Sequence, residues 1–139
     1  MVQQNYVNKL NYYSIMTKHY IFYGTLKSNH GNNYILQNDG VEFLGKVVTQ
    51  PHYTLFDGGF PIVERGGKTS IKGELYKVSN EKVIQRLNNL EGYSGTPGNP
   101  SNWYDVDTIK LDNGVEAEMY VMDFGKSSRT KVVESGIWN

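Results

Sequence analysis

Short apolar runs separated by turns rich in glycine and proline dominate this sequence, and they favour a fold built mainly from short strands. Residues 20–23 form a continuous, bulky run that ends at Gly24-Thr25, which is typical of a buried strand entering a tight turn. Proline cannot donate to a strand ladder, so Gln50-Pro51 marks a break. Further strands are predicted at residues 41–49, 53–57, 62–63, 71–78, 103–111 and 115–123.

Residues 79–90 carry a clear helical pattern. Ser79 is a residue type that caps helix N-termini, and Glu81 in the first turn complements the positive end of the helix dipole. Gly92 is suited to the left-handed conformation that ends many helices. A second, shorter helix is predicted around residues 34–36. The apolar stripe of the main helix consists of Val83, Ile84, Leu87 and Leu90.

The last two predicted strands form a hairpin, because Asp112-Asn113-Gly114 between them is a strong turn signal. In residues 115–123 the smaller apolar side chains alternate with a set that includes two glutamates, so we expect one buried face there. The residues after Lys126 are expected to be mobile for much of their length. Six or seven short strands with one or two packed helices predict an α+β domain with a small mixed, barrel-like sheet.

The chain has the length of one domain, which we assign to residues 16–139. Residues 1–15 are polar and rich in Asn, Gln and Tyr, which favours a peripheral N-terminal extension with Met16 as an alternative start. A short helix or strand packed on the domain explains residues 1–15 equally well.

Charge and composition exclude several classes of function. Lysine plus arginine number 14, as do aspartate plus glutamate, so the formal net charge is zero. Nucleic-acid binding depends mainly on cationic side chains that neutralise backbone phosphates, and this chain has no excess of them. We therefore expect no nucleic-acid partner. No apolar run approaches the roughly 20 residues of a membrane helix, and we expect no membrane partner. Cysteine is absent, which fits a reducing, cytoplasmic location. His19, His30 and His52 lack ligand-like spacing, so no metal and no cofactor are predicted.

Tyrosine is unusually frequent, with 11 residues. A buried tyrosine hydroxyl needs a hydrogen-bond partner. The composition therefore predicts either a polar-edged cavity or many rings at the surface, and both remain open at this point.

Several segments, taken together and in order, resemble the γ-glutamylcyclotransferase-like family, which also includes γ-glutamylamine cyclotransferases and plant proteins induced by avirulence signals. The resemblance covers roughly residues 19–123. It begins at the strand and loop of residues 20–27, which contain Tyr23-Gly24-Thr25-Leu26. It continues through residues 58–61, 71–78, 87–92 and 103–105.

The resemblance implies an intramolecular cyclisation that releases 5-oxoproline and an amine or amino acid from a small γ-glutamyl substrate. It implies that Glu91 is the general acid and base. Its position at the C-terminal end of the predicted helix and partial burial would both raise its pKa toward neutrality, as a base at physiological pH requires. The backbone around Gly24, Thr25 and Leu26 would hold the substrate carboxylate. Tyr23 belongs to the same loop, and Tyr104 and Tyr120 would line the pocket and donate hydrogen bonds. Residues 57–61 would form part of the rim. The loop of residues 93–102 directly follows Glu91, so it would either cover the site or be an uninvolved insertion.

One position departs from the family pattern. The family commonly places an arginine shortly after the tyrosine of the last motif, where this chain has Val106. A non-catalytic binding or regulatory domain of the same fold is therefore the alternative hypothesis. The sequence leaves the oligomeric state and the group attached to the γ-glutamyl moiety open.

Overall fold

The computed structural model describes residues 17–127 and 131–139, so the expectations for residues 1–15 and Met16 lie outside the described residues. All predicted strands are present, and the short helix is a 3₁₀ turn. The elements in chain order are β1 (Lys18–Phe22), η1 (Asn33–Leu36), β2 (Val41–Val48), β3 (Tyr53–Asp57), β4 (Pro61–Arg65), β5 (Lys72–Val78), α2 (Glu81–Glu91), β6 (Asp105–Lys110), β7 (Glu116–Val121) and β8 (Lys131–Val132).

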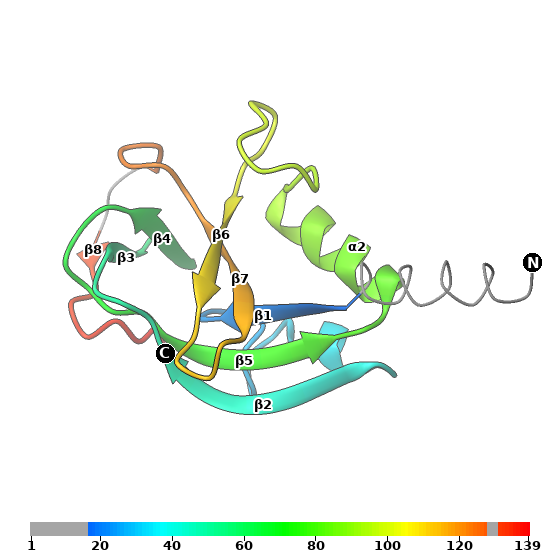
Figure 1. Cartoon of the computed structure of the whole chain (residues 1–139). Helices are drawn as coiled ribbons and strands as arrows, with labels where there is room; N and C mark the ends of the chain where they lie inside the picture. Colours follow the sequence, from blue (N-terminus) through cyan, green and yellow to red (C-terminus); the bar gives the residue numbers. More distant parts are fainter. Residues whose placement is uncertain (1–16, 128–130) are drawn as a thin grey trace, which may run out of the picture.

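The strands form two sheets. The larger has the order β2-β5-β1-β7-β6, and its pairs are antiparallel except β1 with β7; the smaller has the order β4-β3-β8. Met122, just after β7, joins the sheets by exchanging backbone hydrogen bonds with Val63 and Arg65. In the view of Figure 1, α2 and the smaller sheet lie on opposite sides of β6 and β7. The predicted α+β class with a mixed sheet is confirmed, and over the described ranges the sheets curl without closing into a barrel.

Strand β1 is buried on both faces, which explains its continuous apolar run. Tyr20 and Phe22 face a core shared with α2, β6 and β7. Ile21 and Tyr23 face a second core shared with β3 and β4. A one-residue shift in register would exchange these two sets between cores that are packed for different side chains, which would disrupt both. The loop after β1 is therefore held in place from two directions.

Helix α2 begins one residue later than predicted. Asn80, not Ser79, is the N-cap, and its side-chain oxygen accepts from the backbone N–H groups of Lys82 and Val83. Ser79 instead directly follows β5, and its backbone N–H donates to Gly40 O. The predicted end is confirmed, because Gly92 adopts the left-handed conformation with φ 63°.

The apolar stripe of α2 is shorter than predicted. Val83, Ile84 and Leu87 are buried, but Leu90 is exposed. The expected single buried face on β7 is also wrong, because Tyr120 is buried as well as Met119. The C-terminal half of β7 is covered on both sides because α2 packs on one face and the smaller sheet on the other.

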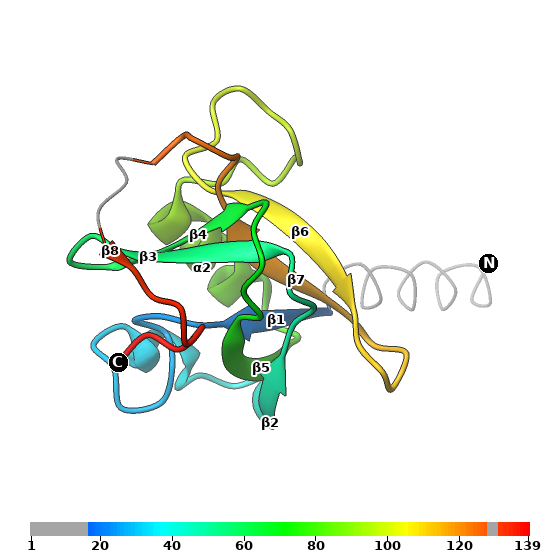
Figure 2. The same cartoon turned by 90° about the vertical axis from the view of Figure 1, so that its left-hand side faces the viewer.

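The expected mobility after Lys126 is wrong for residues 131–139. β8 pairs with β3, and the backbone of Gly136 accepts from Lys72 N–H. The segment then reaches the loop after β1, where the Lys27 ammonium donates to Trp138 O at 2.6 Å. Figure 2 shows this path in red beside the blue loop. The C-terminal segment therefore supports the loop after β1. No described helix has the length and apolar character that a membrane crossing requires.

The end of α2 generates a stability prediction. A Cβ added at Gly92 would lie 2.8 Å from Trp103 Cβ, whereas one added at Gly95, also at positive φ, meets no atom within 4 Å. Both alanine variants carry left-handed strain, but only Gly92→Ala also clashes. We expect Gly92→Ala to lower the free energy of unfolding by about 1 kcal/mol more than Gly95→Ala in urea denaturation. Equal losses would contradict this.

Candidate active site

One small pocket, of about 230 Å³, lies where the loop after β1, the C-terminal end of α2 and the loop between β3 and β4 meet. It is smaller than the roughly 300 Å³ or more of drug-sized sites, and so suits a ligand of amino-acid size. All seven residues singled out from the sequence line it. These are Tyr23, Gly24, Thr25, Leu26, Glu91, Tyr104 and Tyr120, joined by Ile21, Phe22, Asn32, Phe60, Pro61 and Leu90.

The predicted rim is partly found, since Phe60 and Pro61 line the pocket. The loop of residues 93–102, expected as a cover, contributes no lining residue. Asn32 and Leu90 were not predicted. Leu90 has the spacing of a core residue, and a single asparagine in a polar loop carries no sequence signal.

The loop at Gly24 presents unused backbone donors to the pocket. Within the part of the chain that is described, the N–H groups of Gly24, Thr25 and Leu26 have no hydrogen-bond acceptor. All three residues line the pocket, and Gly24 and Leu26 are buried, so these donors lie beside the pocket with little access to bulk water. Clusters of unpaired backbone N–H groups bind anions in proteins.

The shape of this loop is fixed by contacts on either side. The Asn32 side-chain amide donates to Thr25 Oγ1 at 2.8 Å, and Asn32 N–H donates to Thr25 O. The Thr25 hydroxyl proton therefore remains available to a ligand. Lys27 N–H closes the turn on Gly24 O, and the Lys27 ammonium is bound to Trp138 O.

Glu91 is the last residue of α2 and is half-buried in the pocket wall. Burial raises the pKa of its carboxyl from about 4.5 to about 7. In the described chain, no hydrogen bond or ion pair to this carboxylate opposes the effect. The group is therefore poised to accept and release a proton near neutral pH.

Three tyrosine hydroxyls surround Glu91, and each already donates to a protein acceptor. Tyr23 donates to the backbone carbonyl of Tyr120 at 2.6 Å, and Tyr104 donates to that of Pro61 at 3.1 Å. Tyr120 donates to the Asn88 side-chain carbonyl at 2.8 Å. Each hydroxyl thus offers the pocket an acceptor lone pair, which for Tyr104 and Tyr120 differs from the donor role expected from the sequence. The hydroxyls of these rings give the pocket the polar edge that the tyrosine content allowed.

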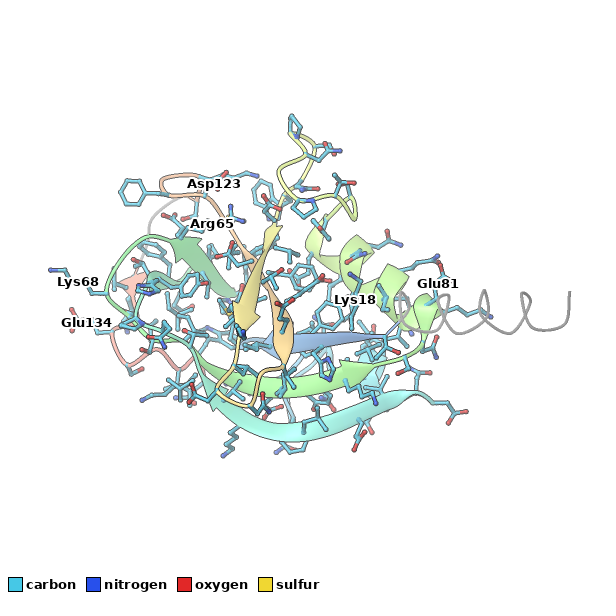
Figure 3. The ribbon with its side chains drawn as sticks, in the orientation of Figure 1. Lys18, Arg65, Lys68, Glu81, Asp123 and Glu134 are labelled. Atoms are coloured by element: carbon cyan, nitrogen blue, oxygen red, sulfur yellow. The ribbon has the colours of Figure 1, made fainter. Side chains whose placement is uncertain are left out.

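Val106 does not line the pocket but is buried in the core that contains Tyr104 and Tyr120. The guanidinium near it comes from Arg65 of β4, which donates to Val106 O and pairs with Asp107 at 2.6 Å. Arg65 also pairs with Asp123, as the labelled side chains in Figure 3 show. This cluster ties β4 to β6 outside the pocket.

The pocket contains a single ionisable carboxylate and no cationic lining residue among those described. The structure shows no group of three or more His, Asp or Glu arranged to hold a metal ion in the described ranges. What the pocket can do is bind an anion through the loop amides and transfer protons through Glu91.

Comparisons with known proteins connect this chain to a family. The family model described as "Gamma-glutamyl cyclotransferase, AIG2-like" matches residues 20–139. A "Putative gamma-glutamylcyclotransferase" of Methanocaldococcus jannaschii is 32% identical over 122 residues, which cover 84% of this chain and 92% of that one. A protein of the same description from Vibrio cholerae is 39% identical over 77 residues, 53% of this chain and 63% of the relative, so less than two thirds of that relative is matched.

Solved structures share the fold. An AIG2-like protein of Mus musculus has a TM-score of 0.68 at 18% identity, with 88% of each chain covered. An uncharacterized protein of Pyrococcus horikoshii has a TM-score of 0.66 at 24% identity, covering 86% of this chain and 88% of that one. At these identities the likeness establishes the fold alone.

The contact between Gly24 and Pro61 generates a prediction for the loop. A Cβ added at Gly24 would lie 2.3 Å from Pro61 Cγ, while one added at Gly31 in the same region meets no atom within 4 Å. We expect Gly24→Ala to lower the free energy of unfolding by about 1–3 kcal/mol and Gly31→Ala to leave it within about 0.5 kcal/mol. Thermal or urea unfolding measures both. Similar effects of the two changes would contradict the close contact.

The raised pKa of Glu91 predicts how stability depends on pH. Because the folded chain keeps this proton up to about pH 7 while the unfolded chain loses it near 4.5, ionisation costs stability as pH rises through that window. Glutamine cannot ionise, so the melting temperature of Glu91→Gln relative to wild type should increase between pH 5 and about pH 7 and level off above that pH. A difference that stays constant over this range would show that the pKa is not raised.

Proposed function

Since the chain belongs to the gamma-glutamyl cyclotransferase, AIG2-like family, we propose that it converts a γ-glutamyl amine or γ-glutamyl amino acid into 5-oxoproline and the free amine, with Glu91 as general acid and base. The family membership agrees with the resemblance seen in the sequence motifs. The observation that carries the proposal is the pairing, in one small pocket, of a carboxyl of pKa about 7 with three unused backbone donors.

The reaction exchanges one amide for another within a single molecule. The α-amine nitrogen bonds to the γ-carbonyl carbon, and the bond from that carbon to the leaving nitrogen breaks. The α-ammonium loses two protons on becoming the ring amide, and the leaving nitrogen gains two on becoming an ammonium. No water or cofactor enters, so protons need only move from one nitrogen to the other.

Glu91 is suited to carry these protons. As a base it removes a proton from the α-ammonium, which frees the nitrogen lone pair for attack. As an acid it then protonates the leaving nitrogen, which would otherwise depart as an unstable anion. A pKa near 7 makes both steps accessible, whereas a carboxyl of ordinary pKa would be a weaker base.

The loop amides supply the complementary part of the site. We assign the substrate α-carboxylate to the N–H groups of Gly24, Thr25 and Leu26, with the Thr25 hydroxyl as a further donor. The acceptor lone pairs of Tyr23, Tyr104 and Tyr120 face the α-ammonium. Holding both ends of the glutamyl group brings the amine to its own γ-carbonyl, which lowers the barrier by removing rotational freedom.

The alternative, a binding or regulatory domain, rests on Val106. In this structure Val106 belongs to the core and is not among the residues that line the pocket. The difference from the family pattern therefore leaves the proposed catalytic groups in place, which favours the enzyme. The cytoplasmic location stays a prediction.

Release of 5-oxoproline tests the proposal. Wild type should form it from members of a panel of γ-glutamyl amines and dipeptides, with kcat/KM rising as pH increases through about 7, where Glu91 ionises. Glu91→Gln should lower kcat by about 10²- to 10⁴-fold, because the proton carrier is lost. Chromatography of 5-oxoproline measures both.

The matched control is Glu116→Gln, which removes an exposed carboxylate of β7 outside the pocket and should retain activity. Circular dichroism checks that each variant is folded. Undiminished turnover in folded Glu91→Gln would remove Glu91 from the mechanism, and absence of turnover by wild type across the panel would favour the binding alternative.

A further inference from the structure

Tyr120 differs from the other two tyrosines beside Glu91 in where its hydroxyl proton goes. Tyr23 and Tyr104 donate to backbone carbonyls, whereas Tyr120 donates to the side-chain carbonyl of Asn88 at 2.8 Å. A backbone acceptor is present whatever residue supplies it, but a side-chain acceptor depends on the residue type. The direction of the Tyr120 hydroxyl is therefore set by a contact that a single substitution can remove.

Asn88 makes this contact from outside the pocket. It is half-buried on α2 and does not line the cavity, whereas Tyr120 does. Glu91 lies three residues later on the same helix, so the two side chains project from one face of α2. The Tyr120 hydroxyl is thus bonded to a residue outside the lining, while Tyr120 shares the cavity with the Glu91 carboxyl.

The ionisable groups that act electrostatically on Glu91 come from three parts of the fold. They are the hydroxyls of Tyr23 after β1, Tyr104 before β6 and Tyr120 on β7. Tyr120 is also influenced by the Tyr20 hydroxyl and the Glu118 carboxylate, neither of which lines the pocket. In the described part of the chain, none of the three hydroxyls donates to Glu91 and no cationic side chain lines the cavity. One added donor would therefore change the balance at Glu91.

Tyr120 would become that donor without Asn88. A buried hydroxyl that loses its acceptor seeks another, and an ionised carboxylate accepts a proton more strongly than a neutral amide does. Rotation about the C–O bond of Tyr120 turns its proton toward the cavity, where Glu91 accepts it directly or through one water. A hydrogen bond donated to a carboxylate stabilises the ionised form and lowers the pKa. It would also take away the lone pair that Tyr120 presents to the pocket.

We propose that Asn88 is a positioning residue of this site: by accepting the Tyr120 proton, it withholds that proton from Glu91 and keeps the Tyr120 lone pair available to the substrate ammonium. This inference rests on the proposed function, in which Glu91 is the base. Burial raises the pKa of Glu91 to about 7, and Asn88 prevents a neighbouring donor from reversing that effect.

Titration of Glu91 tests the proposal without turnover. Its carboxyl is followed by ¹³C NMR in the full chain labelled at glutamate, and Glu91→Gln identifies the signal. Asn88→Leu is close in size but cannot accept, so it should move the titration midpoint of Glu91 down by about one pH unit. Adding Tyr120→Phe to Asn88→Leu should return the midpoint to the wild-type value, because the donor is then absent.

Two further variants separate the acceptor from the local packing. Asn89 is exposed on the same turn of α2, so Asn89→Leu is the matched control and should leave the midpoint unchanged. Asn88→Asp keeps an oxygen acceptor and adds a like charge near Glu91, so the midpoint should stay at the wild-type value or rise. Circular dichroism checks that each variant is folded.

The same change has a kinetic consequence. For a γ-glutamyl amide that wild type converts, Asn88→Leu should move the pH at which kcat/KM reaches half its plateau down by about one pH unit. It should also lower the plateau by about three- to tenfold, since a base of lower pKa removes the ammonium proton less readily. Looser packing alone would lower activity without moving this pH.

The outcomes separate the two proposals. A midpoint that Asn88→Leu leaves at the wild-type value, or lowers equally when Tyr120 is replaced by phenylalanine, overturns the role of Asn88 whatever the turnover. A lowered midpoint that Tyr120→Phe restores establishes it. The expected titrations in a wild type that forms no 5-oxoproline would overturn the proposed function and leave the effect of Asn88 on Glu91 in place.

Discussion

The burial of β1 on both faces is the constraint on which the rest of the structure depends. Tyr20 and Phe22 pack against α2, while Ile21 and Tyr23 pack against the smaller sheet. The chain therefore leaves β1 at a defined point, and Gly24 meets Pro61 so closely that no Cβ fits between them. This contact sets the distance between the loop amides and the opposite pocket wall.

The electrostatics of the pocket follow from what surrounds Glu91. The end of α2 places the carboxyl among tyrosine rings whose hydroxyl protons are already engaged, and the guanidinium of Arg65 is held outside by aspartates. With burial acting and no cation beside it in the described lining, the pKa of Glu91 rises to about 7. In the proposed reaction the substrate carboxylate would be bound by neutral backbone donors, which place no positive charge beside Glu91 and so do not lower its pKa as a cation would.

Local patterns predicted the elements well and their ends less well. The bulky run before Gly24, the turn at residues 112–114 and the left-handed Gly92 each depend on nearby residues, and the structure has all three features. Serine and asparagine cap helices about equally well, so the sequence alone does not distinguish Ser79 from Asn80. The hydrogen bond from Ser79 N–H to Gly40 O, which continues the strand pairing beyond β5, decides in favour of Asn80. The segment of residues 131–139 was expected to be mobile because its partners, β3 and the loop after β1, are distant in sequence.

The sequence by itself determined the strand and helix content, because strand alternation, helical spacing and turn preferences are short-range properties. It singled out the candidate loop and helix end through the resemblance of its ordered motifs to a known family. Tertiary structure alone decided that these two segments share one pocket and that Leu90, although part of the helical stripe, lines this pocket and stays exposed. It also decided that the hydroxyls of Tyr104 and Tyr120 donate their protons to acceptors within the protein. These outcomes depend on which surfaces meet when β1 is covered from both sides, and burial of that kind is a property of the whole fold.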